Sequence, residues 1–194
     1  IANTAHVGDP KLITIALFDE ALARGIDFHK AEVVHIDPAG APALHLANGG
    51  IMTADAVVLC AGVWSKFLLR GLGEHVPLES ERGYNVSFPG ATGIISRPIT
   101  FEGHGFVASA LDTGLRIGGA VEFAGLEAPP NHARTQAMYQ KSSQFIKDIP
   151  AYQTGTVWMG HRPSLPDSLP VIGRSERNAR ILFAFGHGHY GLTQ

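Results

Sequence analysis

The chain has 194 residues, of which 45% are hydrophobic and 16% are charged, which predicts a globular protein of one large or two small domains with a sizeable core. Its 15 basic and 17 acidic side chains leave a formal net charge of -2, so neither nucleic acid nor an anionic membrane is expected as a partner. The single cysteine excludes an internal disulfide and is typical of a reducing, cytoplasmic compartment, and no apolar run approaches the roughly 20 residues of a membrane span.

The first quarter of the chain predicts a helix followed by short strands. Asp9 suits the N-cap, Pro10 the first helical position and Gly25 the stop. One apolar face of this helix would carry Leu12, Ile15, Ala16 and Leu22. Strands are expected at residues 26–29, 32–37 and 44–46, and Asn48-Gly49-Gly50 predicts a turn.

Residues 54–60 have a different character, because their end is continuously apolar. Such a run favours a strand buried on both faces of a parallel sheet, with Cys60 as an inert core residue. The turn Ala61-Gly62 follows, and apolar residues then recur at helical spacing from Trp64 until Gly71 and Gly73 stop the helix. A strand, a small-residue turn and a helix start together are typical of ligand sites in open α/β sheets.

From Pro77 onward, short β-prone runs alternate with turns. Strands are expected at residues 84–88, 94–101, 106–111 and 115–122, and Asp112-Thr113-Gly114 is a hairpin signal. Residues 131–149 predict an amphipathic helix, and residues 181–185 a final buried strand. The middle of the chain is therefore expected to be a mostly antiparallel sheet with one helix.

The last third of the chain carries the clearest functional signal. Residues 160–173 place Arg162 in a loop that three prolines stiffen, and a glycine-rich turn, residues 186–191, follows the final strand. Glycine lets the backbone approach a flat or phosphorylated ligand closely. A guanidinium that faces such a turn suggests a substrate carboxylate held over a cofactor.

Five motifs in this order and spacing resemble a known family: residues 54–65, Pro77-Leu78 with Arg82-Gly83-Tyr84, residues 118–122, Arg162-Pro163 with Asp167, Pro170 and Gly173, and the Gly-His-Gly turn. Together they resemble the flavin-dependent amino-acid oxidoreductases of the D-amino acid oxidase and glycine oxidase type, over nearly all 194 residues. The stretch Arg-Pro-Ser-Leu-Pro-Asp-Ser-Leu-Pro is similar to the bacterial D-amino acid dehydrogenases.

The family opens with a strand, a Gly-x-Gly-x-x-Gly turn and a helix that hold the FAD pyrophosphate, and this chain contains no such unit. The literal match at residues 186–191 does not fit that role, because no acidic residue follows about 20 positions later. The chain also begins at Ile1 without an initiator Met and stops at Gln194, where a helix would normally start. We therefore expect a C-terminal fragment of a longer polypeptide, which binds FAD poorly and shows no turnover by itself.

The resemblance implies an α/β fold, α+β overall. An incomplete FAD-binding Rossmann-like domain, residues 1–75 and 160–194, would contain an inserted antiparallel substrate-binding domain, residues 76–159. The absent first strand would leave residues 57–60 or 181–185 with an unpaired apolar edge, which predicts self-association.

The resemblance also implies roles for particular residues. Arg162 would bind the substrate carboxylate, with His189 and Phe106 beside the substrate; the family's eukaryotic oxidases have tyrosine at the position of Phe106. FAD would contact Val33 on its adenine side, a turn of Ala61, Gly62 and Trp64, and a flavin-covering turn of Gly188, His189, Tyr190, Gly191, Leu192 and Thr193. No general base is nominated, because hydride transfer from Cα needs mainly positioning.

The expected activity is oxidative deamination of a small amino acid, in the D configuration, to a keto acid and ammonia. The alternatives are a secondary-amine oxidase for glycine, sarcosine or proline, and a cofactor-free binding or scaffold fragment. A dehydrogenase would add a quinone acceptor and a peripheral contact with the cytoplasmic face of a membrane. His187 and His189 could suggest a metal site, but turn histidines without a metal are favoured, because no Cys or clustered acid lies at ligand spacing.

Overall fold

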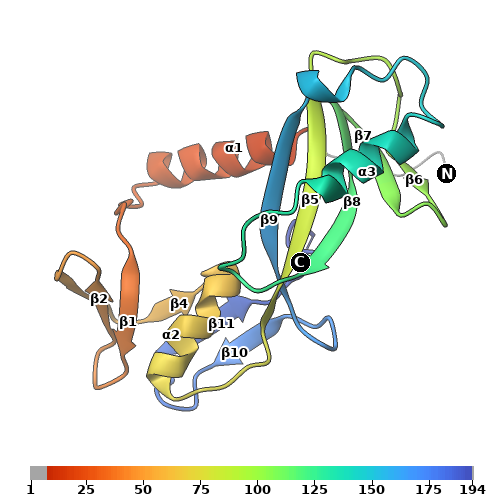
Figure 1. Cartoon of the computed structure of the whole chain (residues 1–194). Coiled ribbons are helices and arrows are strands. Elements are labelled where there is room, and N and C mark those ends of the chain that lie inside the picture. Colours follow the sequence, from red (N-terminus) through yellow and green to blue (C-terminus); the bar gives the residue numbers. More distant parts are fainter. Residues whose placement is uncertain (1–7, 194) are drawn as a thin grey trace. The chain divides into compact units, whose positions relative to one another are not determined.

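The computed structural model describes residues 8–193, which alternate between helices and short strands (Figure 1). In chain order the elements are α1 (Pro10–Ala23), β1 (Val33–Asp37), β2 (Ala43–Leu46), β3 (Ile51–Thr53), β4 (Val57–Leu59), the 3-10 helix η1 (Gly62–Trp64), α2 (Ser65–Leu72), β5 (Glu79–Pro89), β6 (Ile99–Phe101), β7 (Phe106–Leu111), β8 (Gly114–Phe123), α3 (Ala133–Ser142), η2 (Tyr152–Thr154), β9 (Thr156–Ser164), β10 (Val171–Arg174) and β11 (Ile181–Phe185).

The chain divides into two compact units, which are described separately. Unit 1 contains the described residues 8–26 and 82–160, and unit 2 contains residues 27–81 and 161–193. The chain passes between them inside β5 and β9, two neighbouring strands of one sheet. The assignment of a cofactor domain and a substrate domain to parts of the chain remains a prediction.

Unit 2 contains two small sheets. One has the order β10-β11-β4, with β11 parallel to β4 and antiparallel to β10. The other is the antiparallel meander β1-β2-β3. Helix α2 buries Leu68, Leu69 and Leu72 in a core shared with Ile181 and Phe183. Gly73 ends the helix at φ 72°, a left-handed conformation that suits glycine at this position.

Three expectations for unit 2 are wrong. Residues 26–32 form no strand, and Ile26 and Phe28 are exposed. Strand β4 is not buried on both faces, because Val58 is 58% exposed. Cys60 is exposed rather than part of the core. Val58 and Cys60 are exposed because strand β4 lies at the edge of the described sheet, and apolar sequence alone does not show which neighbours cover a strand. This is one of the two places where an unpaired apolar edge was expected, and the self-association expected from it stays a prediction.

Unit 1 is built on the antiparallel hairpin β7-β8, which pairs around the predicted Asp112-Thr113-Gly114 turn. The full sheet has the order β6-β7-β8-β5-β9, and α3 packs against β8 (Figure 1). The unit's core buries mainly apolar side chains of the sheet with two from the helical segment: Val86, Phe88, Phe106, Ala108, Leu115, Ile117, Met138 and Ile146.

Two elements of unit 1 are shorter than the sequence predicts. The expected strand 94–101 is limited to β6, since Pro98 lacks a donor and restricts the residue before it. The expected helix 131–149 ends at Ser142, whose hydroxyl donates a hydrogen bond of 2.9 Å to the Tyr139 carbonyl. Such side-chain bonds compete with helix continuation.

Helix α1 begins as predicted, with the Asp9 carboxylate accepting from the Lys11 backbone N–H at 2.9 Å. The single apolar face expected for it is wrong, because none of its residues is buried and apolar side chains surround the helix. Even so, no helix within residues 8–193 is long and apolar enough to span a membrane.

Candidate functional site

Arg162 lies in strand β9, and not in a proline-stiffened loop as the sequence suggested. Pro163 is tolerated in this strand because β9 is at the edge of the described sheet, where a missing N–H removes no ladder hydrogen bond. The Arg162 side chain is 29% exposed, so part of the guanidinium is accessible to a ligand.

A buried carboxylate organises this part of unit 2. Glu81, near the start of β5, has a side chain only 11% exposed. Its Oε1 lies 3.3 Å from Arg162 Nη1 and 2.5 Å from His189 Nε2, and its Oε2 accepts a hydrogen bond of 2.9 Å from the Ser164 hydroxyl. Two residues predicted to contact the substrate are therefore joined by an acid that sequence reasoning missed.

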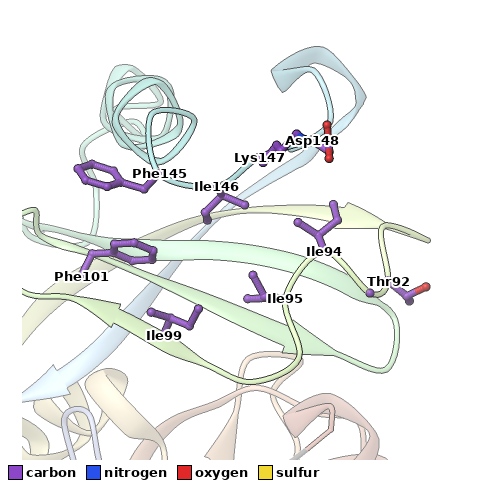
Figure 2. A pocket seen from close by; sticks show the side chains of 10 residues that line it. Thr92, Ile94, Ile95, Ile99, Phe101, Phe145, Ile146, Lys147 and Asp148 are labelled. Atoms are coloured by element: carbon purple, nitrogen blue, oxygen red, sulfur yellow. The ribbon is translucent and has the colours of Figure 1, made fainter.

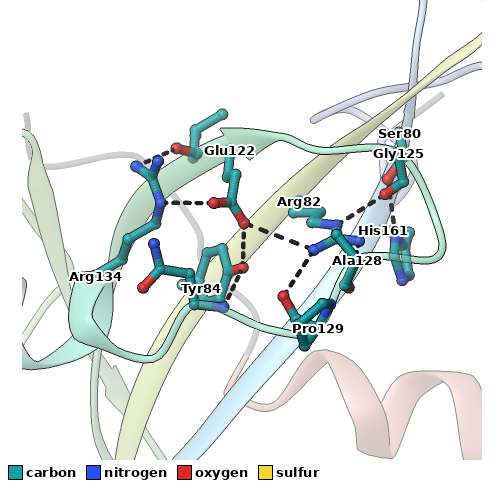
Figure 3. Close-up of polar contacts among 11 residues, drawn as sticks. Ser80, Arg82, Tyr84, Glu122, Gly125, Ala128, Pro129, Arg134 and His161 are labelled. Atoms are coloured by element: carbon teal, nitrogen blue, oxygen red, sulfur yellow. Dashed lines mark hydrogen bonds and ion pairs between the residues drawn. The ribbon is translucent and has the colours of Figure 1, made fainter.

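The alternation of the two strands explains this grouping. Residues 162 and 164 of β9 share one face, whereas His161 points to the other. On that other face the Ser80 hydroxyl and His161 Nδ1 are 2.7 Å apart (Figure 3), and the His161 ring lies 5.9 Å from that of Trp64 in an edge-on arrangement. The neighbours Ser80 and Glu81 thus serve opposite faces of the strand pair.

The glycine-rich turn is held against the end of β9. The Gly188 N–H donates to the Pro163 carbonyl at 2.9 Å. Gly186 has φ 85°, and a Cβ there would lie 2.7 Å from Leu165 Cδ1, so the chain needs glycine for both conformation and space. Gly188 has φ 52° and only Ser164 Oγ, at 3.6 Å, near a Cβ position. Residues 189–193 are exposed beyond it.

The second predicted turn lies at the end of β4. Gly62 has φ 55° with no atom within 4 Å of a Cβ position, Ala61 is half-buried, and Trp64 is 55% exposed. Val33 is half-buried at the start of β1 and packs on the unit 2 core. Bare backbone at Gly62 and Gly188, with an exposed aromatic ring, fits a large flat cofactor such as FAD.

An open apolar hollow of about 470 Å³ also belongs to unit 2. It is lined by Val76 and Pro77 on one side and by residues 165–167 and 169–171 on the other. Of the three prolines expected to stiffen the surroundings of Arg162, Pro166 and Pro170 therefore shape the loop that follows Ser164, whereas Pro163 lies in β9 beside the arginine.

Phe106 lies in unit 1, where it is 2% exposed and stacks on Phe101 with ring centroids 4.3 Å apart. Its predicted contact with substrate remains untested. Unit 1 also contains an open cavity of about 390 Å³ between the 92–101 segment and residues 145–148 (Figure 2). Its walls are mainly isoleucine and phenylalanine, and none of the predicted site residues within 8–193 lines it.

A second polar cluster, also in unit 1, surrounds the fully buried Arg82 (Figure 3). Its guanidinium donates to the carbonyls of Gly125 at 2.8 Å, Ala128 at 2.7 Å and Pro129 at 3.3 Å. Glu122 Oε2 lies 3.7 Å from Arg82 Nη1. The arginine therefore anchors the loop that follows β8.

Glu122, also in unit 1, has several polar partners. The Tyr84 hydroxyl donates to its Oε2 at 2.5 Å, and Arg134 Nε to its Oε1 at 3.2 Å. The hydrogen bond from Tyr84, assisted by Arg134, lowers the pKa of Glu122 below its ordinary value. The pKa of Glu79 is also lowered, first by the Ser80 backbone N–H and then by Lys66.

Residues 8–193 contain no group of three or more His, Cys, Asp or Glu side chains that could hold a metal ion. His189 instead contacts Glu81.

Comparison with known proteins identifies the family of this chain. A family model described as FAD dependent oxidoreductase, DAO, matches residues 1–194. The D-amino-acid oxidase of Bradyrhizobium diazoefficiens is 37% identical over 198 residues, which cover 100% of this chain and 47% of that protein. The D-amino acid dehydrogenase of Dechloromonas aromatica is 31% identical, with 96% of this chain and 46% of that protein covered.

A solved structure supports the fold independently of close sequence similarity. The glycine oxidase from Geobacillus kaustophilus superposes with a TM-score of 0.80 over 92% of this chain and 49% of that chain, at 18% identity. The chain belongs to the FAD-dependent oxidoreductase family DAO, as its motifs suggested, and members of this family use FAD. It spans about half the length of the curated relatives it matches.

Proposed function

We propose that the protein carrying this chain oxidises a small amino acid, in the D configuration, to a keto acid and ammonia with FAD. The relatives named above are a D-amino-acid oxidase and a D-amino acid dehydrogenase. The observation that carries the proposal is the part-exposed Arg162 guanidinium, whose Nη1 contacts Glu81 and which shares this acid with His189 of the glycine turn.

The role of Arg162 follows from its donors. A guanidinium has five N–H groups in a planar fork, and the contact with Glu81 uses one edge of that fork. The other donors can bind a carboxylate in a bidentate manner, which fixes the orientation of the amino acid as well as its affinity. An amine that lacks the acid would leave the arginine without this partner and would be rejected.

The chain's own residues supply positioning rather than acid–base chemistry. The bare backbone at Gly62 and Gly188 would lie against FAD, and Val33 would contact its adenine side. Bound FAD would supply the acceptor for a hydride from the substrate Cα. With the carboxylate held by Arg162, the Cα hydrogen can be aimed at the cofactor, and the imine product hydrolyses to the keto acid and ammonia.

The test is substitution of Arg162 in the full-length gene product that carries this chain. Arg162→Ala should lower kcat/KM for amino acids by about 100-fold or more, because a bound carboxylate loses its charged partner. Arg162→Lys should recover only part, since an ammonium cannot make the fork. Arg174→Ala is the matched control, because this exposed arginine of unit 2 donates to the Ala179 carbonyl at 3.3 Å.

The substrate panel separates the alternatives. D- and L-alanine, glycine, sarcosine and proline should be compared, with flavin absorbance recorded to establish cofactor binding. Preference for D-alanine supports the proposal, whereas preference for glycine, sarcosine or proline supports a secondary-amine oxidase. Wild-type kcat/KM in Arg162→Ala would show that the arginine does not bind the substrate, and absence of flavin binding would favour a cofactor-free role.

A further inference from the structure

Glu81 occupies the centre of the polar group in unit 2, and no sequence motif pointed to it. Both of its carboxylate oxygens are engaged, Oε1 by Arg162 and His189 and Oε2 by Ser164. Its side chain is 11% exposed, against 29% for Arg162 and 54% for His189. The acid therefore lies beneath the two groups that a ligand would meet.

This arrangement fixes geometry. Arg162 has a long side chain with many rotamers, and an exposed arginine loses this freedom only when a partner holds it. Glu81 lies on the neighbouring strand and reaches Nη1, while the same oxygen holds the ring of His189 through Nε2. One carboxylate thus fixes the relative positions of a strand residue and a turn residue that are both exposed.

The arrangement also fixes charge. The charges of Arg162 and ionised Glu81 sum to zero. The Glu81 carboxylate therefore already balances the charge of the guanidinium that a ligand carboxylate would bind. A second carboxylate on the same ligand would be repelled by Glu81, and His189, which could carry a positive charge, already faces that acid.

We propose that Glu81 is the positioning residue for Arg162 and His189, and that its charge makes the site select amino acids with one carboxylate over those with two. The proposal rests on the function proposed above for Arg162. Glu81 acts through the two side chains that it holds and is not itself in contact with the substrate.

The experiment compares glutamine with glutamate, in the enantiomer that the full-length protein oxidises, because these substrates differ in charge and little in shape. Glu81→Gln keeps the side-chain length and removes the charge. In this variant the kcat/KM for glutamate divided by the kcat/KM for glutamine should rise by about 10-fold. For glutamine, KM should rise by a larger factor than kcat falls. Glu81→Asp keeps the charge but shortens the reach, so it should lower kcat/KM and leave the ratio unchanged.

Glu79→Gln is the matched control, since Glu79 is a half-exposed acid of the same strand that pairs with Lys66 at 3.0 Å. This variant should leave the kcat/KM for both substrates unchanged. An unchanged ratio in folded Glu81→Gln would overturn the proposal even if Arg162→Ala abolishes activity. An unaffected Arg162→Ala would instead contradict the proposed function.

A binding measurement needs no turnover. Succinamate and succinate, which differ by one carboxylate, can be titrated into the full-length protein while the Arg162 and His189 side-chain nitrogens are followed by NMR. Wild type should bind succinamate more tightly, and Glu81→Gln should reduce that preference by about 10-fold. If wild type and Glu81→Gln prefer succinamate to the same degree, the Glu81 charge does not select the ligand. If Glu81→Gln leaves the Arg162 and His189 side-chain signals unaltered, Glu81 does not position these residues.

Discussion

Two arginine–glutamate clusters, one in each unit, use the same chemistry for different purposes. Arg82 is fully buried, and three loop carbonyls and Glu122 surround its guanidinium. Arg162 is 29% exposed, and its Nη1 contacts Glu81. A buried arginine that is bonded to three loop carbonyls holds a loop in place, whereas a part-exposed arginine with further donors can bind a ligand.

The sharpest test of this contrast is the stability of the two alanine variants. Arg82→Ala should lower the free energy of unfolding by about 3–5 kcal/mol, because buried carbonyls and Glu122 lose their partner. Arg162→Ala should cost about 1 kcal/mol, since the pair is partly screened by water. Urea unfolding of both variants, followed by circular dichroism, measures the difference. Equal losses would mean that exposure does not separate the two roles.

The glycine turn beside Arg162 offers a smaller effect. Gly186→Ala should destabilise the protein by about 1–2 kcal/mol, because it places a Cβ in a left-handed conformation and against Leu165. Gly188→Ala has more space and should cost about 1 kcal/mol. Thermal melting of both variants measures which of them loses more stability.

The Gly188→Ala variant also tests the contact with the cofactor. If FAD lies over Gly188, then Gly188→Ala should weaken flavin binding by the full-length protein more than its small stability loss suggests, which a fluorescence titration measures. Equal flavin affinity in wild type and Gly188→Ala would remove this residue from the cofactor site.

The smallest expected effect concerns pH and the Arg82 cluster. Because the pKa of Glu122 is lowered in the folded state, its stabilising contribution is present above the ordinary value of 4.5 and is lost as the pH falls through the lowered value. Tyr84→Phe removes the main cause, so its melting temperature should fall less between pH 6 and pH 3.5 than that of wild type.

Tyr139→Phe is the control for this measurement, because the Tyr139 hydroxyl donates to the Pro150 carbonyl and not to an acid. Its melting temperature should keep the wild-type dependence on pH. If Tyr84→Phe retains the full acid sensitivity, another carboxyl group dominates in this range.

The sequence by itself determined the features that depend on a few neighbouring residues. The Asp9-Pro10 helix start, the Asp112-Thr113-Gly114 hairpin, the glycine stop at Gly73 and the glycine turn after β11 all follow from local backbone preferences. The continuously apolar end of residues 54–60 predicted a strand of a parallel sheet, and β4 pairs in parallel with β11. Local sterics do not change with the rest of the fold, which is why these expectations were met.

Only the tertiary structure decided which side chains meet. Glu81 and Arg162 are 81 positions apart, and they touch because β5 and β9 are neighbours in one register. A shift of one residue would have turned His161 toward Glu81 instead. The exposure of Val58 and Cys60 was likewise decided by the position of β4 at a sheet edge. Apolar content shows that a strand can be buried, but whether it is buried depends on which neighbours cover it.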